Sequence, residues 1–167
     1  AMNKDVYFKK IVDFWYARQT QEKGVSMKFR VAQDLFSSHK VDTGTAFLLQ
    51  TLDNEDIYKP ETFHKILDLG CGYGPIGLTL KKLDEGRVVH MVDRDALALD
   101  YTRQNAALNH ISDVNVYGSL GYDDVQATDF DLIISNIPGK VGDRVIAHLL
   151  QDAVYYLKPG GIVAIVV

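Results

Sequence analysis

The sequence predicts an α/β fold of the doubly wound, Rossmann-like kind, in which helices cover both faces of a parallel sheet. The first observation is a compact apolar run over 66–69, as expected of a strand that is buried on both faces. The second is the turn that follows, with three spaced glycines and then Pro75, a residue suited to the first turn of a helix. The third is the recurrence of strand-like runs, separated by helical patterns, at 87–93, 114–117, 130–136 and 162–167.

Length and composition indicate an ordinary globular protein. The chain has 167 residues, enough for one domain with a sizeable core, and 47% of them are hydrophobic against 24% charged. No apolar run approaches the roughly 20 residues of a membrane span, and the charged amino end is not a secretory signal. The single Cys71 excludes an internal disulfide and indicates a reducing, cytoplasmic location. The five histidines are scattered, so we expect no metal site.

The charge is unevenly distributed along the chain. The formal net charge is −4, but residues 1–40 hold eight Lys and Arg against four acids. A locally basic amino end is suited to phosphates, which it binds with release of counterions. An ordinary solvated face explains the same charge equally well.

The amino-terminal third carries three expected elements. Tyr7, Ile11, Phe14 and Trp15 recur at helical spacing, which predicts an amphipathic helix over 6–18. Residues 25–31 alternate apolar and polar side chains, which predicts a strand. A helix then begins near residue 43, with Thr43 or Thr45 as its cap.

The glycine turn admits two kinds of ligand. Its spacing over 72–77 satisfies the dinucleotide pattern G-x-G-x-x-G, which is weak by itself. The broader string that runs from Asp68 to Gly74 resembles motif I of the class I methyltransferases that use S-adenosylmethionine (SAM). The resemblance implies SAM as the cofactor, with its methionine end held by Asp68 and the turn residues Gly70, Cys71, Gly72 and Gly74. A carboxylate suits the ammonium of that end, and turn N–H groups suit its carboxylate. A turn without any ligand is the plain alternative.

Further cofactor contacts are expected at the ends of the next two strands. Asp93 ends the strand over 87–93, 23 residues after Gly70, which is the spacing of an acid that accepts ribose hydroxyls in SAM and NAD enzymes alike. Arg94 follows it, and Asp95 is expected to cap a helix over 96–109 with Leu97, Tyr101 and Leu108 inward. In the methyltransferase family the loop after the third strand lies beside the adenine, where this chain has Ser119 and Leu120. Asp123 and Asp124 stand slightly farther on, so the partner of the adenine amino group stays open.

The segment before motif I resembles that of one group within these methyltransferases. Small-domain methyltransferases related to the bacterial ribosomal RNA guanine-N2 enzymes have a pattern close to F-S-x-x-x-x-D-x-G-[ST], and this chain matches it in order at Phe36, Ser37, Asp42, Gly44 and Thr45. In that family the segment forms one wall of the cleft for cofactor and substrate. The resemblance therefore assigns Phe36, Asp42 and Thr43 to the substrate side. A loop with a helix cap would explain only the Gly and Thr.

The strand over 130–136 ends in Asn136-Ile-Pro138-Gly-Lys140. Related amino-methyltransferases have Asn-Pro-Pro-aromatic here. The resemblance makes Asn136 and Pro138 catalytic, and it also places Asn136 among the residues that bind the cofactor. An amide oxygen and the next carbonyl can accept the two N–H groups of a base amine and turn its lone pair toward the methyl group. This chain departs from the pattern, with Ile137 at the first Pro and Gly139 at the aromatic that would stack on a flipped base. Lys140 is expected to neutralise a substrate phosphate.

The carboxyl-terminal part is predicted as a helix over 142–158 and a strand over 162–167. Val145, Leu149, Leu150 and Val154 recur at core spacing, and Lys158-Pro-Gly-Gly161 is expected to end the helix. The family continues through a further helix and strand pair, so the sheet is expected to lack its last strands. The last strand would then be an open hydrophobic edge, which indicates a fragment or a homo-oligomer that covers it.

We therefore predict one domain, with an extension over 1–45 (helix, strand and cleft wall) and a SAM-binding core over 46–167. The predicted function is a SAM-dependent methyltransferase that acts on a guanine nitrogen of RNA, most directly ribosomal RNA. A small molecule or a protein amide is the alternative acceptor. A non-catalytic binding module and an NAD(P) oxidoreductase, in which Arg94 would take a 2′-phosphate, are alternatives from other classes.

Overall fold

A computed structural model describes residues 7–18, 21–32, 43–53, 62–137 and 141–167, with the backbone alone over 7–18 and 21–23. Its centre is a five-stranded sheet in the order β5-β4-β3-β6-β7, and every neighbouring pair in it is parallel. The strands are β3 (Lys65–Leu69), β4 (Val88–Asp93), β5 (Asn115–Gly118), β6 (Phe130–Asn136) and β7 (Leu157–Val166). The chain builds outward from β3 to β5 and then returns to place β6 on the other side of β3. This reversal confirms the predicted doubly wound sheet and creates a switch point between β3 and β6.

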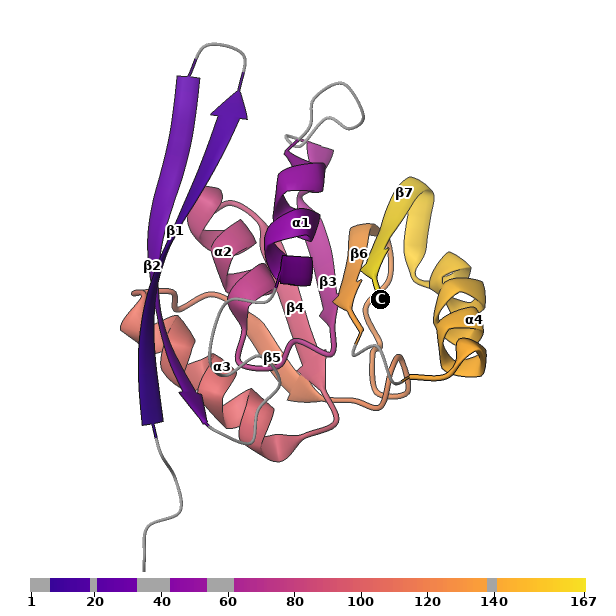
Figure 1. The fold of residues 1–167 in the computed structure, drawn as a ribbon. Helices are drawn as coiled ribbons and strands as arrows, with labels where there is room; N and C mark the ends of the chain where they lie inside the picture. Colours follow the sequence, from indigo (N-terminus) through magenta and orange to yellow (C-terminus); the bar gives the residue numbers. More distant parts are fainter. Residues whose placement is uncertain (1–6, 19–20, 33–42, 54–61, 138–140) are drawn as a thin grey trace, which may run out of the picture.

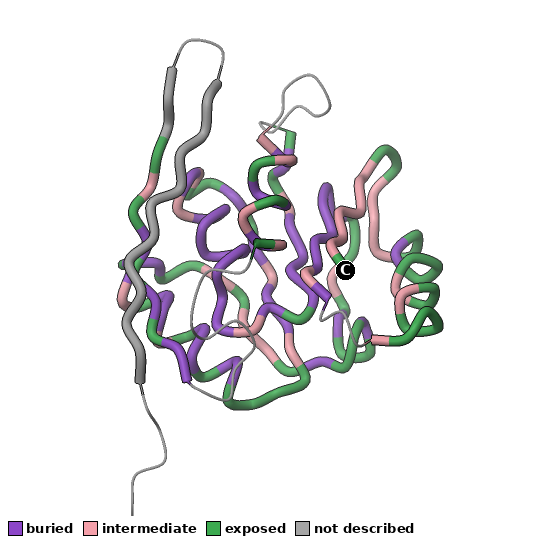
Figure 2. Tube along the Cα trace, in the orientation of Figure 1, coloured by how far each residue is buried: buried purple, intermediate pink, exposed green. Residues whose placement is uncertain are grey.

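The two faces of the sheet are covered differently (Figure 1). One core joins alternate residues of β3, such as Ile66, to three helices and to β2 (Gln21–Ala32). These helices are α1 (Thr43–Leu52), α2 (Pro75–Leu83) and α3 (Ala96–Leu108). The opposite core, around Leu67 and Ile133, is closed by the loop residues Tyr122 and Val125 and by Ala153. Figure 2 shows the central strands and α2 as mostly buried, in contrast to α4 (Asp143–Asp152).

The helix after β3 begins at Pro75, as predicted, and ends at Leu83. The cap of α3 is also confirmed, since the Asp95 carboxylate accepts the N–H of Leu97 at 2.9 Å. Its inward face was only partly predicted. Tyr101 is buried, but Leu97 is exposed and Leu108 is half-buried. Polar residues face inward instead, among them Asn105.

The predicted helix over 6–18 is wrong. Residues Tyr7–Arg18 form the strand β1, which pairs antiparallel with β2 from Tyr7↔Ala32 to Arg18↔Gln21. A spacing of four residues returns to the same face of a strand as well as of a helix, so Tyr7, Ile11 and Trp15 did not discriminate. The aromatic and β-branched composition favours the strand, and pairing with β2 stabilises it. The strand predicted over 25–31 is confirmed within β2, with Met27, Phe29 and Val31 fully buried.

The predicted helix over 142–158 is too long. Helix α4 ends at Asp152, a 3₁₀ turn η2 spans Ala153–Tyr155, and β7 already begins at Leu157. Lys158-Pro-Gly-Gly161 therefore lies inside β7, at an irregularity in its register with β6, rather than ending a helix. Gly161 is required there, because a Cβ would stand 2.8 Å from the carbonyl oxygen of Phe130. The expected core spacing is also wrong, since Val145, Leu150 and Val154 are exposed.

Strand β7 stands at the edge of the sheet, as the sequence predicted. Within the described ranges, every helix is too short or too polar to span a bilayer.

Candidate functional site

A cavity of about 620 Å³ opens over the carboxyl ends of β3, β4 and β6, at the switch point. It is lined by the glycine turn and helix start, by residues that follow β4 and β5, by the end of β6 and by one face of α4. The lining residues are Thr45, Leu69, Gly70, Cys71, Gly72, Tyr73, Pro75, Ile76, Asp93, Arg94, Asp95, Ala98, Ser119, Leu120, Gly121, Ser135, Asn136, Ile137, Val141, Gly142, Val145 and Leu149.

The turn is shaped by glycines in the left-handed region, with φ of 68° at Gly70, 59° at Gly72 and 97° at Gly74. A Cβ built on Gly70 or Gly72 would meet no atom within 4 Å, so these two residues border open space in the cavity. A ligand can therefore approach the backbone closely at both positions.

Four of the turn amides, those of Gly70, Cys71, Gly72 and Gly74, donate hydrogen bonds within the protein. The N–H groups of Gly70 and Cys71 both donate to the Val92 carbonyl at 2.9 Å, and that of Gly74 donates to the Cys71 carbonyl at 3.0 Å. The N–H of Gly72 donates to Asp93 Oδ2 at 3.0 Å. These donors are used to fold the turn and are not turned toward a ligand carboxylate.

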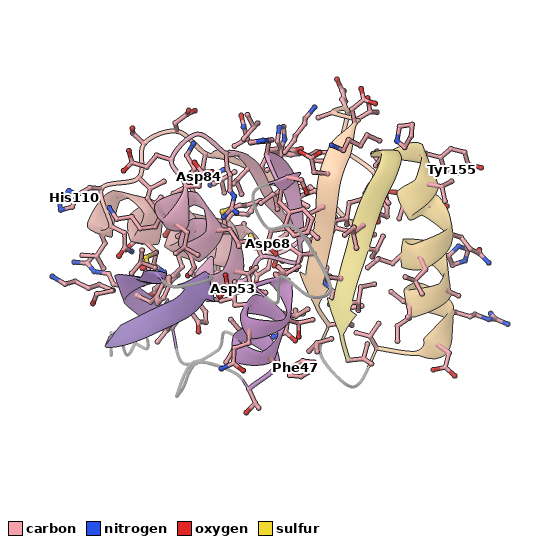
Figure 3. The ribbon with its side chains drawn as sticks, turned by 90° about the horizontal axis from the view of Figure 1, so that it is seen from above. Phe47, Asp53, Asp68, Asp84, His110 and Tyr155 are labelled. Carbon is pink, nitrogen blue, oxygen red and sulfur yellow. The ribbon has the colours of Figure 1, made fainter. Side chains whose placement is uncertain are left out.

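Asp68, a residue of β3, lies in the interior of the molecule (Figure 3) and does not line the cavity. Its side chain is 1% exposed, and Oδ2 accepts the N–H of Gly77 at 2.9 Å. Burial raises the pKa of Asp68 to about 7; the Gly77 N–H opposes that shift and the nearby Asp93 charge adds to it. The carboxyl thus holds the start of α2 against β3, and its expected contact with a ligand ammonium stays a prediction.

Asp93 is placed as the sequence predicted, at the end of β4 and on the cavity. Its Oδ2 accepts from Gly72 and its Oδ1 accepts the N–H of Asp95 at 2.9 Å, so the two backbone amides fix the carboxylate plane. Each oxygen keeps a second lone pair for a hydroxyl donor. Arg94, the next residue, also lines the cavity.

The loop after β5 contributes shape and an apolar surface. Ser119 is buried, and its hydroxyl donates to the Gly121 carbonyl at 2.7 Å and accepts the Asp124 N–H at 3.0 Å. Leu120 lines the cavity while remaining 60% exposed. Ser119 is therefore occupied in fixing the loop, and Leu120 offers an exposed apolar surface to the cavity.

Asn136 ends β6 on the far side of the cavity, where the sequence placed it. Its Nδ2 donates to the hydroxyl of Thr45 at 3.2 Å, and the following Ile137 N–H donates to the Val166 carbonyl at 2.9 Å. The hydroxyl orients the Asn136 amide, and β7 fixes the strand end. The sequence analysis offered Thr45 as a helix cap and as the last position of the F-S…D-x-G-[ST] pattern of the cleft wall, but it did not assign Thr45 to the site; the structure places Thr45 on the cavity.

Four of the predicted residues, Phe36, Asp42, Pro138 and Lys140, lie outside the described residues. Thr43 is described, but it is exposed and does not line the cavity. Cys71 is buried beside Thr102, and burial raises the pKa of its thiol, so it has the structural character expected. In the described part of the chain, no three His, Cys, Asp or Glu side chains gather as metal ligands.

The comparison with protein families matches residues 26–167 to the methyltransferase small domain. The chain belongs to this family. The match covers the sheet, the glycine turn and Asn136.

Individual relatives agree with the family. The chain is 34% identical over 134 residues to the uncharacterized protein YbxB of Bacillus subtilis, which covers 80% of this chain and 64% of the relative. It is 38% identical over 160 residues to ribosomal RNA small subunit methyltransferase C of Hahella chejuensis, which covers 92% of this chain and 44% of that enzyme. A solved structure of a T. thermophilus 16S rRNA N2 methyltransferase, in complex with AdoMet (SAM) and guanosine, matches with a TM-score of 0.75 and 25% identity over 93% of this chain and 41% of that one. This chain thus spans about two fifths to two thirds of these relatives.

Proposed function

We propose that the cavity binds SAM and that the domain transfers its methyl group to a guanine nitrogen of ribosomal RNA. The observation that carries the proposal is the placement of Asn136 across one cavity from Asp93 and the glycine turn. Family membership supports the cofactor, and the relatives named as ribosomal RNA methyltransferases support the acceptor.

The residues on the turn side fit SAM. The open space beside Gly70 and Gly72 admits the extended amino acid part, and the oriented carboxylate of Asp93 accepts the ribose hydroxyls. The apolar Leu120 covers one face of the adenine. Bound SAM supplies an electrophilic methyl group on a sulfonium.

The residues on the far side fit a base amine. The exocyclic amine of guanine is a weak nucleophile, because its lone pair is delocalised into the ring. Asn136 Oδ1 accepts one of its N–H groups, while Thr45 holds the Nδ2 end of the same amide. This orients the lone pair toward the methyl group, an effect of proximity and preorganisation rather than of covalent catalysis.

The test uses labelled SAM, ribosomal RNA from cells that lack this protein, and three proteins: wild type, Asn136→Ala and Asn115→Ala. Asn115 is an exposed residue of β5 that does not line the cavity, so it is the matched control. We expect Asn136→Ala to lower transfer on the order of a hundredfold, as for loss of one preorganised group at a reacting centre. Binding of S-adenosylhomocysteine should change little in either variant.

The outcomes separate the parts of the proposal. If the wild-type protein bound neither SAM nor S-adenosylhomocysteine, the proposed cofactor would be refuted. If SAM bound but no methyl group were transferred to any RNA fraction, RNA would be refuted as the acceptor. Unchanged transfer by Asn136→Ala would remove the role given to that amide.

A further inference from the structure

Helix α3 and its C-cap residue, Asn109, carry a buried polar stripe formed by Thr102, Asn105 and Asn109. These residues are spaced three and four apart and therefore share one face of the helix. Their exposed fractions are 0%, 0% and 6%. Buried amides and hydroxyls are costly unless they are hydrogen-bonded, so the partners of the stripe explain why it is there.

The two asparagines bind the backbone of β2 as a neighbouring strand would. Asn105 Oδ1 accepts the N–H of Arg30 at 2.6 Å and its Nδ2 donates to the Arg30 carbonyl at 2.9 Å. Asn109 Oδ1 accepts the N–H of Lys28 at 2.9 Å and its Nδ2 donates to the Lys28 carbonyl at 2.7 Å. Strand β1 pairs with the other edge of β2, so the hairpin of β1 and β2 is docked onto α3 through its second edge (Figure 1).

The same stripe also holds the glycine turn. Thr102 Oγ1 donates to the Gly72 carbonyl at 2.8 Å, and Asn105 Nδ2 donates to the Tyr73 carbonyl at 2.8 Å. The Tyr73 ring in turn meets Phe29 of β2 edge to face, with centroids 5.6 Å apart. Of the two asparagines, Asn105 bonds the turn as well as the hairpin, whereas the remaining bond of Asn109 goes to the Asn105 carbonyl in its own helix.

We infer that Asn105 is a positioning residue for the cofactor turn. Because Asn105 also binds β2, the docked hairpin of β1 and β2 is part of the cofactor site. Loss of this side chain leaves the Tyr73 carbonyl without its amide donor, and the turn must then be ordered when the ligand binds. Coupling of this kind is reciprocal, so a ligand on the turn must also tighten the docking of the hairpin. The inference rests on the proposed function only for the identity of the ligand.

The experiment compares Asn105→Ala with Asn109→Ala. Each variant removes two hydrogen bonds to β2, so both should lose comparable stability toward urea. Only Asn105→Ala also removes a bond to the turn. We expect it to weaken binding of S-adenosylhomocysteine about tenfold, as for one buried hydrogen bond, and Asn109→Ala to stay within about twofold of wild type, measured by calorimetry.

Amide hydrogen exchange on the wild type provides a readout that needs no variant. Saturating S-adenosylhomocysteine should slow exchange at Lys28 and Arg30, and the effect at Lys28 should disappear in Asn105→Ala, where Asn109 still binds that amide. The inference would be overturned if the two variants bound S-adenosylhomocysteine with equal affinity. It would also be overturned if amide exchange in the hairpin did not change when the ligand binds. A wild type that binds no S-adenosylhomocysteine would instead refute the proposed cofactor.

Discussion

Helices α2 and α4 border the same cavity, yet they are embedded very differently. In α2 all residues except Lys82 are buried, whereas no residue of α4 is buried. The sequences of both helices place apolar residues at core spacing. Helix α2 lies between the sheet, β2 and α1, whereas among the described helices and strands α4 contacts chiefly the turn η2. Tyr155 in η2 points outward, 74% exposed (Figure 3). The period of the apolar residues therefore shows which face of a helix can be buried. Whether that face is buried depends on the elements that lie opposite it.

The largest effect expected from this contrast is on stability. Leu78 in α2 is fully buried, and Leu78→Ala should lower the free energy of unfolding by about 2–5 kcal/mol because a cavity remains. Leu150 in α4 is 48% exposed, and Leu150→Ala should change it by less than about 0.5 kcal/mol. Urea denaturation of both variants measures the difference, with unchanged m values as the control. Similar losses in the two helices would mean that α4 is packed after all.

The second contrast concerns two buried aspartates on neighbouring strands. Burial raises the pKa of Asp68 on β3 to about 7. Burial also opposes ionisation of Asp131 on β6, but Lys158 and the backbone amides of Lys65 and His64 outweigh it and hold the pKa of Asp131 below its usual value.

The two carboxyls should therefore give pH dependences of opposite sign. Between about pH 4 and 7 folded Asp68 holds a proton that the unfolded chain releases, so its contribution to stability falls as pH rises, by up to about 1.4 kcal/mol per pH unit. The stability that Asp131 contributes is present above the pKa of this carboxyl in the unfolded chain. It is lost as the pH falls through the lower pKa of Asp131 in the folded protein. Urea titrations from pH 3 to 8 on Asp68→Asn and Asp131→Asn should remove the first and the second dependence respectively. Identical pH profiles of wild type and Asp68→Asn would contradict the assignment.

A smaller effect distinguishes two glycines at positive φ. A Cβ at Gly74, φ 97°, would lie 2.8 Å from Leu78 Cδ1, whereas at Gly160 in β7, φ 80°, it meets nothing within 4 Å. Both alanine variants incur backbone strain of about 1–2 kcal/mol. Gly74→Ala should in addition weaken S-adenosylhomocysteine binding severalfold, because it moves the turn against α2, while Gly160→Ala should leave affinity unchanged. Paired thermal denaturation and calorimetry test this, and equal affinities would show that the turn tolerates the shift.

Prediction from sequence succeeded where the determinants are adjacent in the chain. Gly70, Gly72, Gly74 and Pro75 define the turn and the start of α2, and Asp93 and Asn136 follow apolar runs whose ends meet at one edge of a parallel sheet. It failed for β1, where the apolar residues Tyr7, Ile11 and Trp15, four apart, suit a helix and a strand equally. It also failed for Asn105, since an asparagine in a helix gives no sign of a strand partner 75 residues away.

Local backbone preference and the period of the apolar residues were enough to predict the parallel sheet, the glycine turn, and the carboxylate and amide at the rim of the cavity. Tertiary structure decided the rest: that β1 is a strand, that Asp68 lies in the interior, that Thr45 meets Asn136, and that α4 remains exposed. The physical reason is common to these cases. Whether a side chain is buried or hydrogen-bonded depends on which groups from distant parts of the chain pack against it. The chemical identity of the side chain alone does not specify that partner.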